Sequence, residues 1–200
     1  LKRKGQCYVL HASGRKVCMD IGASTGGFTD CMLQNGAVKV YAVDVGYGQL
    51  AWSLRTDARV INMERTNIRN VKPEDLTEPV AFFSVDVSFI SLKHIFPVAD
   101  AICTPDAVGV CLVKPQFEAG KGKVGKRALS ASRRFTLRCC RIMWKNAHAA
   151  GFKVLDVTFS PIKPEGNIEF LGYLAKQGEE HIPDLAEVVR QAHEELDAKA

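Results

Sequence analysis

A glycine-rich stretch near the start of the chain has the residue types of a nucleotide-binding turn. The apolar run Val17–Ile21 predicts a strand, and the turn at 22–27 leads from it into a helical pattern at 28–34. Glycines have no Cβ, so they can take positive φ and let the backbone approach a ligand closely. The first turn of the helix adds unpaired N–H groups. The stretch therefore predicts a loop that cradles a nucleotide.

The spacing of this turn, and the acid beside it, favour a ligand that carries positive charge. The glycines fall as G-x-x-x-G-G, and Asp20 lies at the end of the strand. Dinucleotide folds instead use G-x-G-x-x-G to set a pyrophosphate on a helix N-terminus. A carboxylate at position 20 would repel pyrophosphate, which disfavours an NAD-type dehydrogenase. It would suit the ammonium and sulfonium of S-adenosylmethionine, although the loop alone does not name the ligand.

A second acid ends the next apolar run. Asp44 follows 38–43, about twenty residues past the first loop, where an acid hydrogen-bonds a ribose diol in doubly wound folds. We predict that Asp44 binds the ribose; the alternative is that it only caps the following turn. Thr66 and Asn67 follow a third predicted strand at the same edge, where we expect one of them to meet the adenine.

Composition indicates one domain in a reducing compartment. With 200 residues and 46% apolar content the chain can bury a full core, and no run approaches the roughly 20 apolar residues of a membrane span. Seven cysteines, an odd number without C-x-x-C spacing, argue against a disulfide framework or a zinc site, and the five histidines show no ligand spacing. The first residues lack the apolar core of a signal peptide. We expect a cytoplasmic protein without a metal.

Charge is spread unevenly along the chain, whose formal net charge is +5. Residues 114–145 hold ten basic residues against one acid, whereas residues 176–200 hold three basic residues against seven acids. The basic segment favours a polyanion such as nucleic acid as partner. The alternative is a solvated helix face.

Apolar runs and helical patterns alternate along the chain, which predicts an α/β domain with a mainly parallel sheet. No helical pattern separates the last two runs, so we expect a terminal antiparallel hairpin at the sheet edge. Residues 132–150 predict a long helix that Gly151 ends, and residues 182–196 predict an acidic amphipathic helix. The seven predicted strands are 17–21, 38–44, 59–63, 80–85, 107–113, 152–159 and 168–174.

With these residues in view, the chain resembles the TlyA-type (hemolysin A family) ribosomal-RNA methyltransferases, which are relatives of the FtsJ-type ribose 2′-O-methyltransferases. The similarity runs from about Lys16 to Leu174. Several motifs are long, ordered and correctly spaced, so this signal is more specific than a lone glycine-rich loop. The motifs are DIGASTGGFT at 20–29, AVDVGYGQL at 42–50, ERTN at 64–67, DVSFIS at 86–91, KPQFE at 114–118 and GNIEF at 166–170.

The resemblance implies a Rossmann-like class I methyltransferase fold, S-adenosylmethionine as methyl donor, and ribosomal RNA or a ribosomal subunit as partner. It also implies a Lys-Asp-Lys-Glu tetrad around the target ribose. Asp86, Lys114 and Glu169 match three members, and Lys2, with Lys4 behind it, is the candidate for the first lysine. The predicted donor-binding residues are Asp20, Gly22, Ala23, Ser24, Thr25, Gly26, Gly27, Phe28, Asp44, Val45, Thr66, Asn67 and Asp86.

The resemblance also implies a domain division. Members of the family carry an S4-like RNA-binding module ahead of the methyltransferase domain. We expect residues 1–15 to be a lead-in remnant that follows this missing module, residues 16–176 to be the FtsJ-like domain, and residues 177–200 to form the acidic C-terminal helix.

The matched tetrad residues suit transfer of a methyl group from a sulfonium to a hydroxyl. Such an in-line displacement needs no metal, because the donor is already activated; the protein must align three atoms and accept a proton. A lysine among apolar neighbours and cations can have its pKa lowered, so Lys114 would act as general base or orient the hydroxyl. Asp86 would hold this lysine and face the sulfonium, and Glu169 would hold the other lysine and the ribose. The alternatives are a helix cap near Ser91 for Asp86, a phosphate contact for Lys114 and a surface acid for Glu169.

Two other functions stay open from the sequence. The older family name suggests a membrane-active hemolysin, which needs an apolar or cationic amphipathic segment, but the clear amphipathic helix at 182–196 is acidic. The other is a cofactor-binding, RNA-binding protein without catalytic activity. The sequence predicts no oligomeric state.

Overall fold

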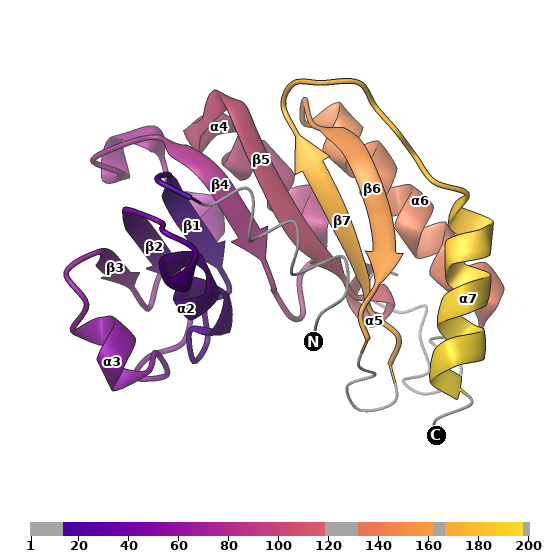
Figure 1. Ribbon diagram of the computed structural model, residues 1–200, viewed down its shortest axis with the longest axis horizontal. Helices are drawn as coiled ribbons and strands as arrows, with labels where there is room; N and C mark the ends of the chain where they lie inside the picture. The colour runs from indigo at the N-terminus through magenta and orange to yellow at the C-terminus, as the bar shows by residue number, and fades with distance from the viewer. Residues whose placement is uncertain (1–13, 119–131, 162–166, 198–200) are drawn as a thin grey trace.

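The computed structural model describes residues 14–118, 132–161 and 167–197 of the chain. One seven-stranded sheet runs through it (Figure 1). Its strands are β1 (Val17–Ile21), β2 (Lys39–Val43), β3 (Val60–Met63), β4 (Val80–Val85), β5 (Cys103–Val113), β6 (Lys153–Phe159) and β7 (Phe170–Ala175). The helices are α2 (Gly27–Gln34), α3 (Trp52–Arg55), α4 (Phe96–Ile102), α5 (Pro115–Glu118), α6 (Arg133–Ala149) and α7 (Leu185–Asp197), with short 3-10 helices η1 (Ile68–Asn70), η2 (Pro73–Asp75) and η3 (Leu92–His94).

The strand order is β3-β2-β1-β4-β5-β7-β6. Strands β1 to β5 pair in parallel, whereas β7 lies antiparallel between β5 and β6. The predicted α/β fold, with a mainly parallel sheet and a terminal antiparallel pair, is therefore confirmed. The chain leaves β1 toward β2 on one side and later returns to β4 on the other side. Open α/β sheets bind ligands at such a switch point, outside the carboxyl ends of the strands.

Successive residues of the central strands pack on opposite faces of the sheet. On one face Cys18 and Phe82 join a core with side chains of α2 and α3, and on the other Met19 and Phe83 join a core with α4, α6 and α7. Figure 1 shows α2 on the viewer's side of the sheet and α6 behind it. Because helices cover both faces, polar groups that serve a ligand must lie at the edge where the parallel strands end.

Several element boundaries differ from the prediction. Strand β5 begins at Cys103 rather than at 107, and its pairing with β4 shifts register between Val80 and Phe82. Residues 104–106 are polar and include a proline, so they lack the pattern of a strand. For this reason the sequence did not predict the first part of β5. Helix α5 was not predicted, since a run of four residues that begins with proline has no helical periodicity.

Candidate active site

The glycine-rich loop after β1 is held in left-handed backbone conformations. Gly22 has φ 86°, Ser24 has φ 48°, and Gly26, the residue before α2, has φ 99°. A Cβ on Gly22 would lie 2.2 Å from the carbonyl oxygen of Asp86, so the loop touches the backbone that follows β4. Only glycine fits this contact, and the loop can therefore fold tightly over the carboxyl ends of two neighbouring strands.

Asp20 is enclosed beneath this loop and does not face a ligand. One of its carboxylate oxygens accepts hydrogen bonds from the backbone N–H (2.9 Å) and the hydroxyl (2.8 Å) of Thr29, and the other accepts one from the hydroxyl of Ser84 (2.8 Å). The residue is 1% exposed, and burial raises its pKa to about 6 despite these hydrogen bonds. The prediction that Asp20 meets the positive charge of a ligand directly is thus wrong. Its role is to join the first turn of α2 to β1 and β4.

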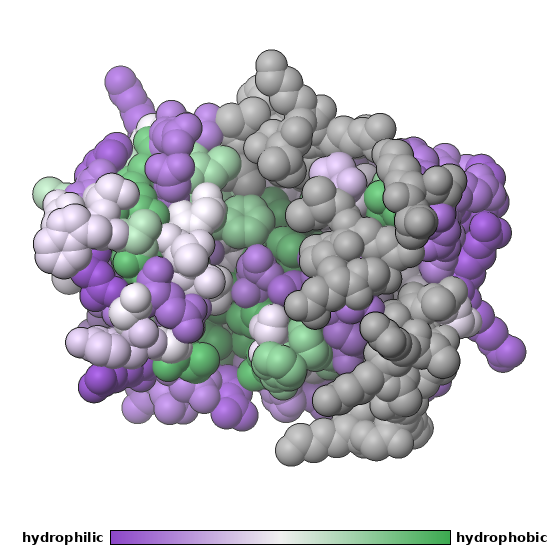
Figure 2. Space-filling model, turned by 90° about the horizontal axis from the view of Figure 1, so that it is seen from below, coloured by the Kyte–Doolittle hydropathy of each residue, from purple (hydrophilic) through white to green (hydrophobic). Residues whose placement is uncertain are grey.

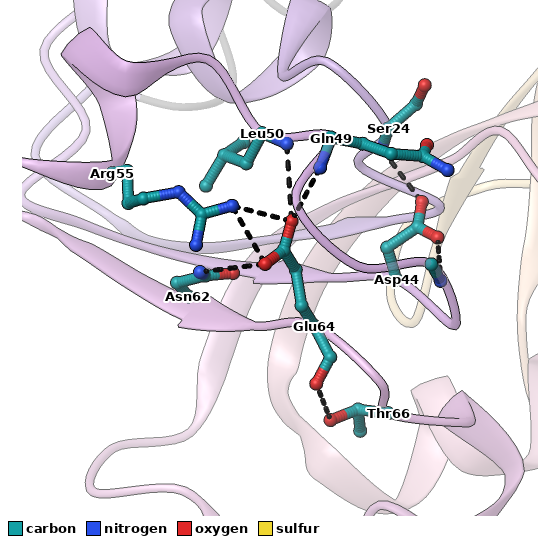
Figure 3. Close-up of polar contacts among 9 residues, drawn as sticks. Ser24, Asp44, Gln49, Leu50, Arg55, Asn62, Glu64 and Thr66 are labelled. Carbon is teal, nitrogen blue, oxygen red and sulfur yellow. Dashed lines mark hydrogen bonds and ion pairs between the residues drawn. The ribbon is translucent and has the colours of Figure 1, made fainter.

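Asp44 lies at the carboxyl end of β2 and turns toward the glycine-rich loop (Figure 3). Its two oxygens accept the backbone N–H groups of Ser24 (2.8 Å) and Gly46 (2.7 Å). The second bond is the turn cap that the sequence left as an alternative. A carboxylate oxygen can accept two hydrogen bonds, so both oxygens retain capacity for a ligand hydroxyl. Position 45 beside it is 71% exposed.

Glu64 is a residue to which the sequence reasoning gave no role. Its carboxylate accepts both backbone N–H groups of Gln49 (2.9 Å) and Leu50 (3.3 Å) and lies 2.8 Å from the guanidinium of Arg55 through each oxygen (Figure 3). Burial works against the charged form, but these donors outweigh it and lower the pKa of Glu64 to about 2. Glu64 thereby fixes the segment between β2 and α3. The sequence held one signal for a role of Glu64: it comes directly after β3, at the same edge of the sheet as Asp44.

Thr66 and Asn67 make local hydrogen bonds beside this segment. The backbone N–H of Thr66 donates to the carbonyl of Asp44 (2.9 Å), and the side chain of Asn67 accepts the backbone N–H of Arg69 (3.1 Å) at the start of η1. Their contact with adenine stays a prediction.

Asp86, Lys114 and Glu169 come together at the carboxyl edge. Lys114 Nζ lies 2.6 Å from Asp86 Oδ1, 4.0 Å from Glu169 Oε1 and 3.4 Å from the hydroxyl of Ser88. They meet because Asp86 follows β4, Lys114 follows β5, and Glu169 precedes β7, whose antiparallel start pairs Phe170 with the end of β5. Figure 2 looks onto this edge, where a recessed area at the middle of the face carries both hydrophobic and hydrophilic side chains.

The surroundings of these three side chains exclude two of the alternative roles. Ser91, rather than Asp86, accepts a backbone N–H at the start of η3. Glu169 is buried rather than a surface acid. Burial and the nearby charge of Asp86 raise the pKa of Glu169, and the ammonium of Lys114 offsets this only in part. A lysine between two carboxylates at a ligand-binding edge is an arrangement that can orient a hydroxyl or accept a proton.

Two aromatic residues beside this cluster were missed by the sequence reasoning. Phe89 is 90% exposed with φ 65°, and its ring centroid lies 4.9 Å from that of Phe117. The segments that carry them are joined by the buried carboxylate of Glu118, which accepts the hydroxyl of Ser91 (2.7 Å) and the backbone N–H of Leu92 (2.9 Å). An exposed phenylalanine in a left-handed conformation is uncommon, and both signals appear only in the folded chain.

The other predicted positions differ in whether the structure describes them. Ala23 and Thr25 lie in the loop, and Gly27 and Phe28 open α2. Lys2 and Lys4 lie outside the described residues. Within the described residues no group of three or more His, Cys, Asp or Glu could hold a metal ion, and none of the six cysteines there forms a disulfide.

The fold is that of S-adenosylmethionine-dependent methyltransferases. A solved structure of such an enzyme from Mesorhizobium loti, 12% identical, superimposes with a TM-score of 0.61 over 86% of this chain and 95% of that chain. The model for the FtsJ-like methyltransferase family matches residues 3–176. The chain therefore belongs to the FtsJ-like methyltransferase family, and the resemblance found in its motifs is confirmed.

Individual relatives agree with this assignment. The candidate rRNA methyltransferase YqxC of Bacillus subtilis is 46% identical over 92% of this chain and 68% of its own length. The 16S/23S rRNA (cytidine-2′-O)-methyltransferase TlyA of Mycobacterium tuberculosis is 43% identical over 86% of this chain and 64% of its own length. The chain thus spans about two thirds of the length of these curated relatives.

A solved candidate hemolysin from Streptococcus thermophilus is 41% identical, with a TM-score of 0.86 over 99% of this chain and 76% of that chain. Among the described helices, none is both long and apolar enough to cross a bilayer.

Proposed function

We propose that the chain transfers a methyl group from S-adenosylmethionine to a ribose 2′-hydroxyl of ribosomal RNA. The observation that carries the proposal is the position of Lys114 between Glu169 and Asp86, whose backbone contacts Gly22 of the glycine-rich loop. The rRNA (cytidine-2′-O)-methyltransferase activity of the M. tuberculosis relative TlyA, at 43% identity, supports the choice of ribose and of ribosomal RNA. Such a substrate implies work in the cytoplasm and on a ribosomal subunit or its RNA.

The residues at the edge suit this donor. Gly22 and Gly26 let the loop pack tightly against Asp86 and Leu54 at the edge of the sheet. Asp44 has free lone pairs for a ribose diol, and Asp86 adds a negative charge that attracts a sulfonium. S-adenosylmethionine supplies a methyl group bonded to a positively charged sulfur. The proposed donor contacts are Gly22, Ala23, Ser24, Thr25, Gly26, Gly27, Phe28, Asp44, Val45, Thr66, Asn67 and Asp86.

The chain's own residues then position the acceptor. The hydroxyl oxygen forms a bond to the methyl carbon while the carbon–sulfur bond breaks and its electron pair goes to sulfur, so the hydroxyl proton must leave. Lys114 can take this proton as a neutral amine, or as an ammonium it can donate to the oxygen and aim its lone pair. Asp86 and Glu169 hold the Lys114 side chain in place for either mode. Lys2, with Lys4 behind it, stays the predicted fourth member.

The aromatic pair at this edge suits a nucleic-acid acceptor. Phe89 offers an exposed ring next to Ser88, whose hydroxyl contacts Lys114. Proteins that act on single-stranded RNA commonly stack unpaired bases on such rings. This arrangement supports an RNA acceptor over a small-molecule one.

The test combines one variant with a matched control. We expect Lys114→Ala to lower the rate of methyl transfer to purified ribosomal RNA about 10²- to 10⁴-fold while the chain still binds S-adenosylmethionine in calorimetry. Lys176→Ala is the control, because Lys176 is also mostly buried and paired with a carboxylate, Asp100 at 2.8 Å, outside the site. Mass-spectrometric analysis of nucleosides would identify the methylated ribose. Unchanged transfer by Lys114→Ala would contradict the assigned role of Lys114.

The two alternatives, a non-catalytic RNA-binding protein and a membrane-active hemolysin, give different outcomes in binding, transfer and vesicle-release assays. Binding of S-adenosylmethionine without transfer by the unsubstituted chain would favour a non-catalytic RNA-binding protein. Release of vesicle contents without methyl transfer would favour a membrane-active hemolysin. Helix α6 is cationic and amphipathic, contrary to the prediction that only the acidic helix is amphipathic, but its apolar side is buried in the core. That burial argues against insertion into a membrane.

A further inference from the structure

Helix α6 presents a row of cations on the side that faces away from the sheet. Its other side is committed to the protein interior, where Cys140, Met143 and Ala147 belong to the core. The exposed cations follow one another at intervals of four, three and four residues, a spacing that keeps them on one face of a helix. We call this row the α6 stripe. It consists of Arg134, Arg138, Arg141 and Lys145.

The α6 stripe lacks the acidic partners that neighbouring cations have. Arg190 on α7 forms ion pairs with Glu187 (2.5 Å) and Glu194 (2.6 Å), and Arg133 lies 3.8 Å from Glu194. No acidic side chain in the described ranges forms an ion pair with any residue of the α6 stripe. An ordinary solvated helix face mixes both signs of charge, as α7 does. Four cations without counter-charges make a local positive field that attracts a polyanion.

A groove lies beside the α6 stripe, and its lining comes from α6, from the segment that leads into α7 and from the first residue of α7. Its volume of about 480 Å³ falls in the range of ligand-binding sites. Trp144 in its wall is fixed by a hydrogen bond from its ring N–H to Glu180 (3.0 Å). The lining consists of Arg138, Arg141, Ile142, Trp144, Lys145, Ile182 and Leu185. A groove with cations and a half-buried aromatic ring can hold a sugar–phosphate chain together with a base.

Helix α6 packs beside the candidate active site through its buried side. Cys139 Sγ lies 3.8 Å from the carbonyl oxygen of Pro115, the residue after Lys114. From Arg134 to Lys145 the helix rises about 16 Å, at 1.5 Å per residue. A strand whose target ribose reaches Lys114 can therefore continue along α6.

We propose that the α6 stripe and its groove bind the phosphate backbone of the RNA substrate at a distance from the methylated nucleotide. The proposal rests on the proposed function for the identity of the RNA, but phosphate binding itself does not require catalysis. RNA fits better than an anionic membrane, because the apolar side of α6 is buried and only the cations and the groove remain for contact. Phosphate contacts of this kind set affinity and register without reading sequence.

The test measures binding of a fluorescein-labelled single-stranded RNA as a function of KCl concentration. We expect the double variant Arg138→Gln/Arg141→Gln to bind more weakly and to lower the magnitude of the slope of log K against log[salt] by about 0.7 for each phosphate that the variant no longer neutralises. Arg190→Gln is the matched control, since it removes an exposed arginine that already has two acidic partners. With ribosomal RNA as substrate, the double variant should raise KM and leave kcat and S-adenosylmethionine affinity unchanged.

Three outcomes would overturn the proposal. The first is an unchanged salt slope in the double variant, and the second is an equal change in Arg190→Gln. The third is that the double variant loses binding to phosphatidylserine–phosphatidylcholine vesicles but not to RNA. The proposed function fails separately, if the unsubstituted chain binds S-adenosylmethionine and RNA but transfers no methyl group; a reduced salt slope in the double variant would then still support phosphate binding by α6.

Discussion

The carboxyl edge has two parts whose side chains are held in place in different ways. We call the part with Asp20, Asp44 and the glycine-rich loop the donor side, and the part with Asp86, Lys114 and Glu169 the catalytic side. On the donor side the acids are held by donors that belong to the scaffold: Asp20 by Thr29 and Ser84, and Asp44 by backbone N–H groups. On the catalytic side Asp86, Lys114 and Glu169 are held mainly by one another. The donor side is thus shaped before any ligand arrives, whereas each catalytic group depends on its partners.

The different surroundings of Asp86 and Asp20 indicate which side of the edge can bind the acceptor. Asp86 Oδ1 is buried and lies 2.6 Å from Lys114 Nζ, yet the pair lacks hydrogen-bond geometry and no other hydrogen-bond partner meets this oxygen in the parts of the chain that the structure describes. A buried carboxylate oxygen normally has a hydrogen-bonded partner. An acceptor hydroxyl can therefore be bound at Lys114 on the catalytic side, whereas Asp20 on the donor side is enclosed by Thr29 and Ser84 and out of reach of a ligand.

The largest effect should come from removing one charge on the catalytic side. We expect Asp86→Asn to lower kcat about 10²-fold, because Lys114 loses its closest partner and a shift of about 1 Å in a catalytic group costs a factor of this size. Single-turnover methyl transfer to ribosomal RNA measures this. Asp100→Asn removes a similar lysine partner, Lys176 at 2.8 Å, outside the site and serves as control. Equal losses of kcat in both variants would contradict a specific role of Asp86 in holding Lys114 for methyl transfer.

On the donor side, Asp20 should affect stability and its pH dependence rather than chemistry. Its pKa rises from 3.8 to about 6 on folding, so the folded state binds the proton more tightly than the unfolded state. The contribution of Asp20 to the free energy of unfolding is then largest below its unfolded pKa, and it falls by up to about 3 kcal/mol as pH rises through the folded pKa. The deficit of Asp20→Asn should accordingly shrink between about pH 4 and pH 7.

Urea unfolding of both proteins across this range measures that effect. Asp57→Asn is a control of opposite sign, since the Arg59 hydrogen bonds lower the pKa of the half-buried Asp57 to about 2. The contribution of Asp57 is present above its unfolded pKa and is lost as pH falls through the folded one. A deficit of Asp20→Asn that stays constant with pH would contradict a raised pKa for Asp20.

The smallest effect should come from a change at Glu64, which belongs to the donor side and holds the 49–50 segment through hydrogen bonds. We expect Glu64→Gln to weaken S-adenosylmethionine binding roughly tenfold, because the loss of the charge weakens the bonds to Arg55 and to the backbone of the 49–50 segment. Calorimetric titration with the donor measures this affinity. Glu78→Gln, which removes an exposed partner of Lys39 elsewhere on the chain, should leave it unchanged. A loss of donor affinity as large as the loss of kcat in Asp86→Asn would show that the donor side is not shaped independently of the catalytic side.

Much of the edge was predictable because it depends on where strands end. Asp86 and Lys114 follow apolar runs, and parallel strands end at one edge, so their meeting follows from the sequence order. The burial of Asp20 could not be predicted in the same way, since it depends on Ser84, which lies on the neighbouring strand β4 and is distant in the sequence. The role of Glu64 was hidden for a similar reason, because its partners are the backbone of a loop at 49–50, which has no periodic pattern, and Arg55 at the end of the short helix α3.

The close approach at Gly22 has a consequence for engineering donor preference. Its missing Cβ would stand 2.2 Å from the main chain of Asp86, and the N–H of Asp86 donates to the carbonyl of Ile21 at 2.8 Å. Any side chain at position 22 would thus spread β1 from β4 and displace the acid that reaches Lys114. A mutant library that seeks acceptance of enlarged sulfonium analogues should keep this glycine constant and randomise Val45, whose side chain is 71% exposed.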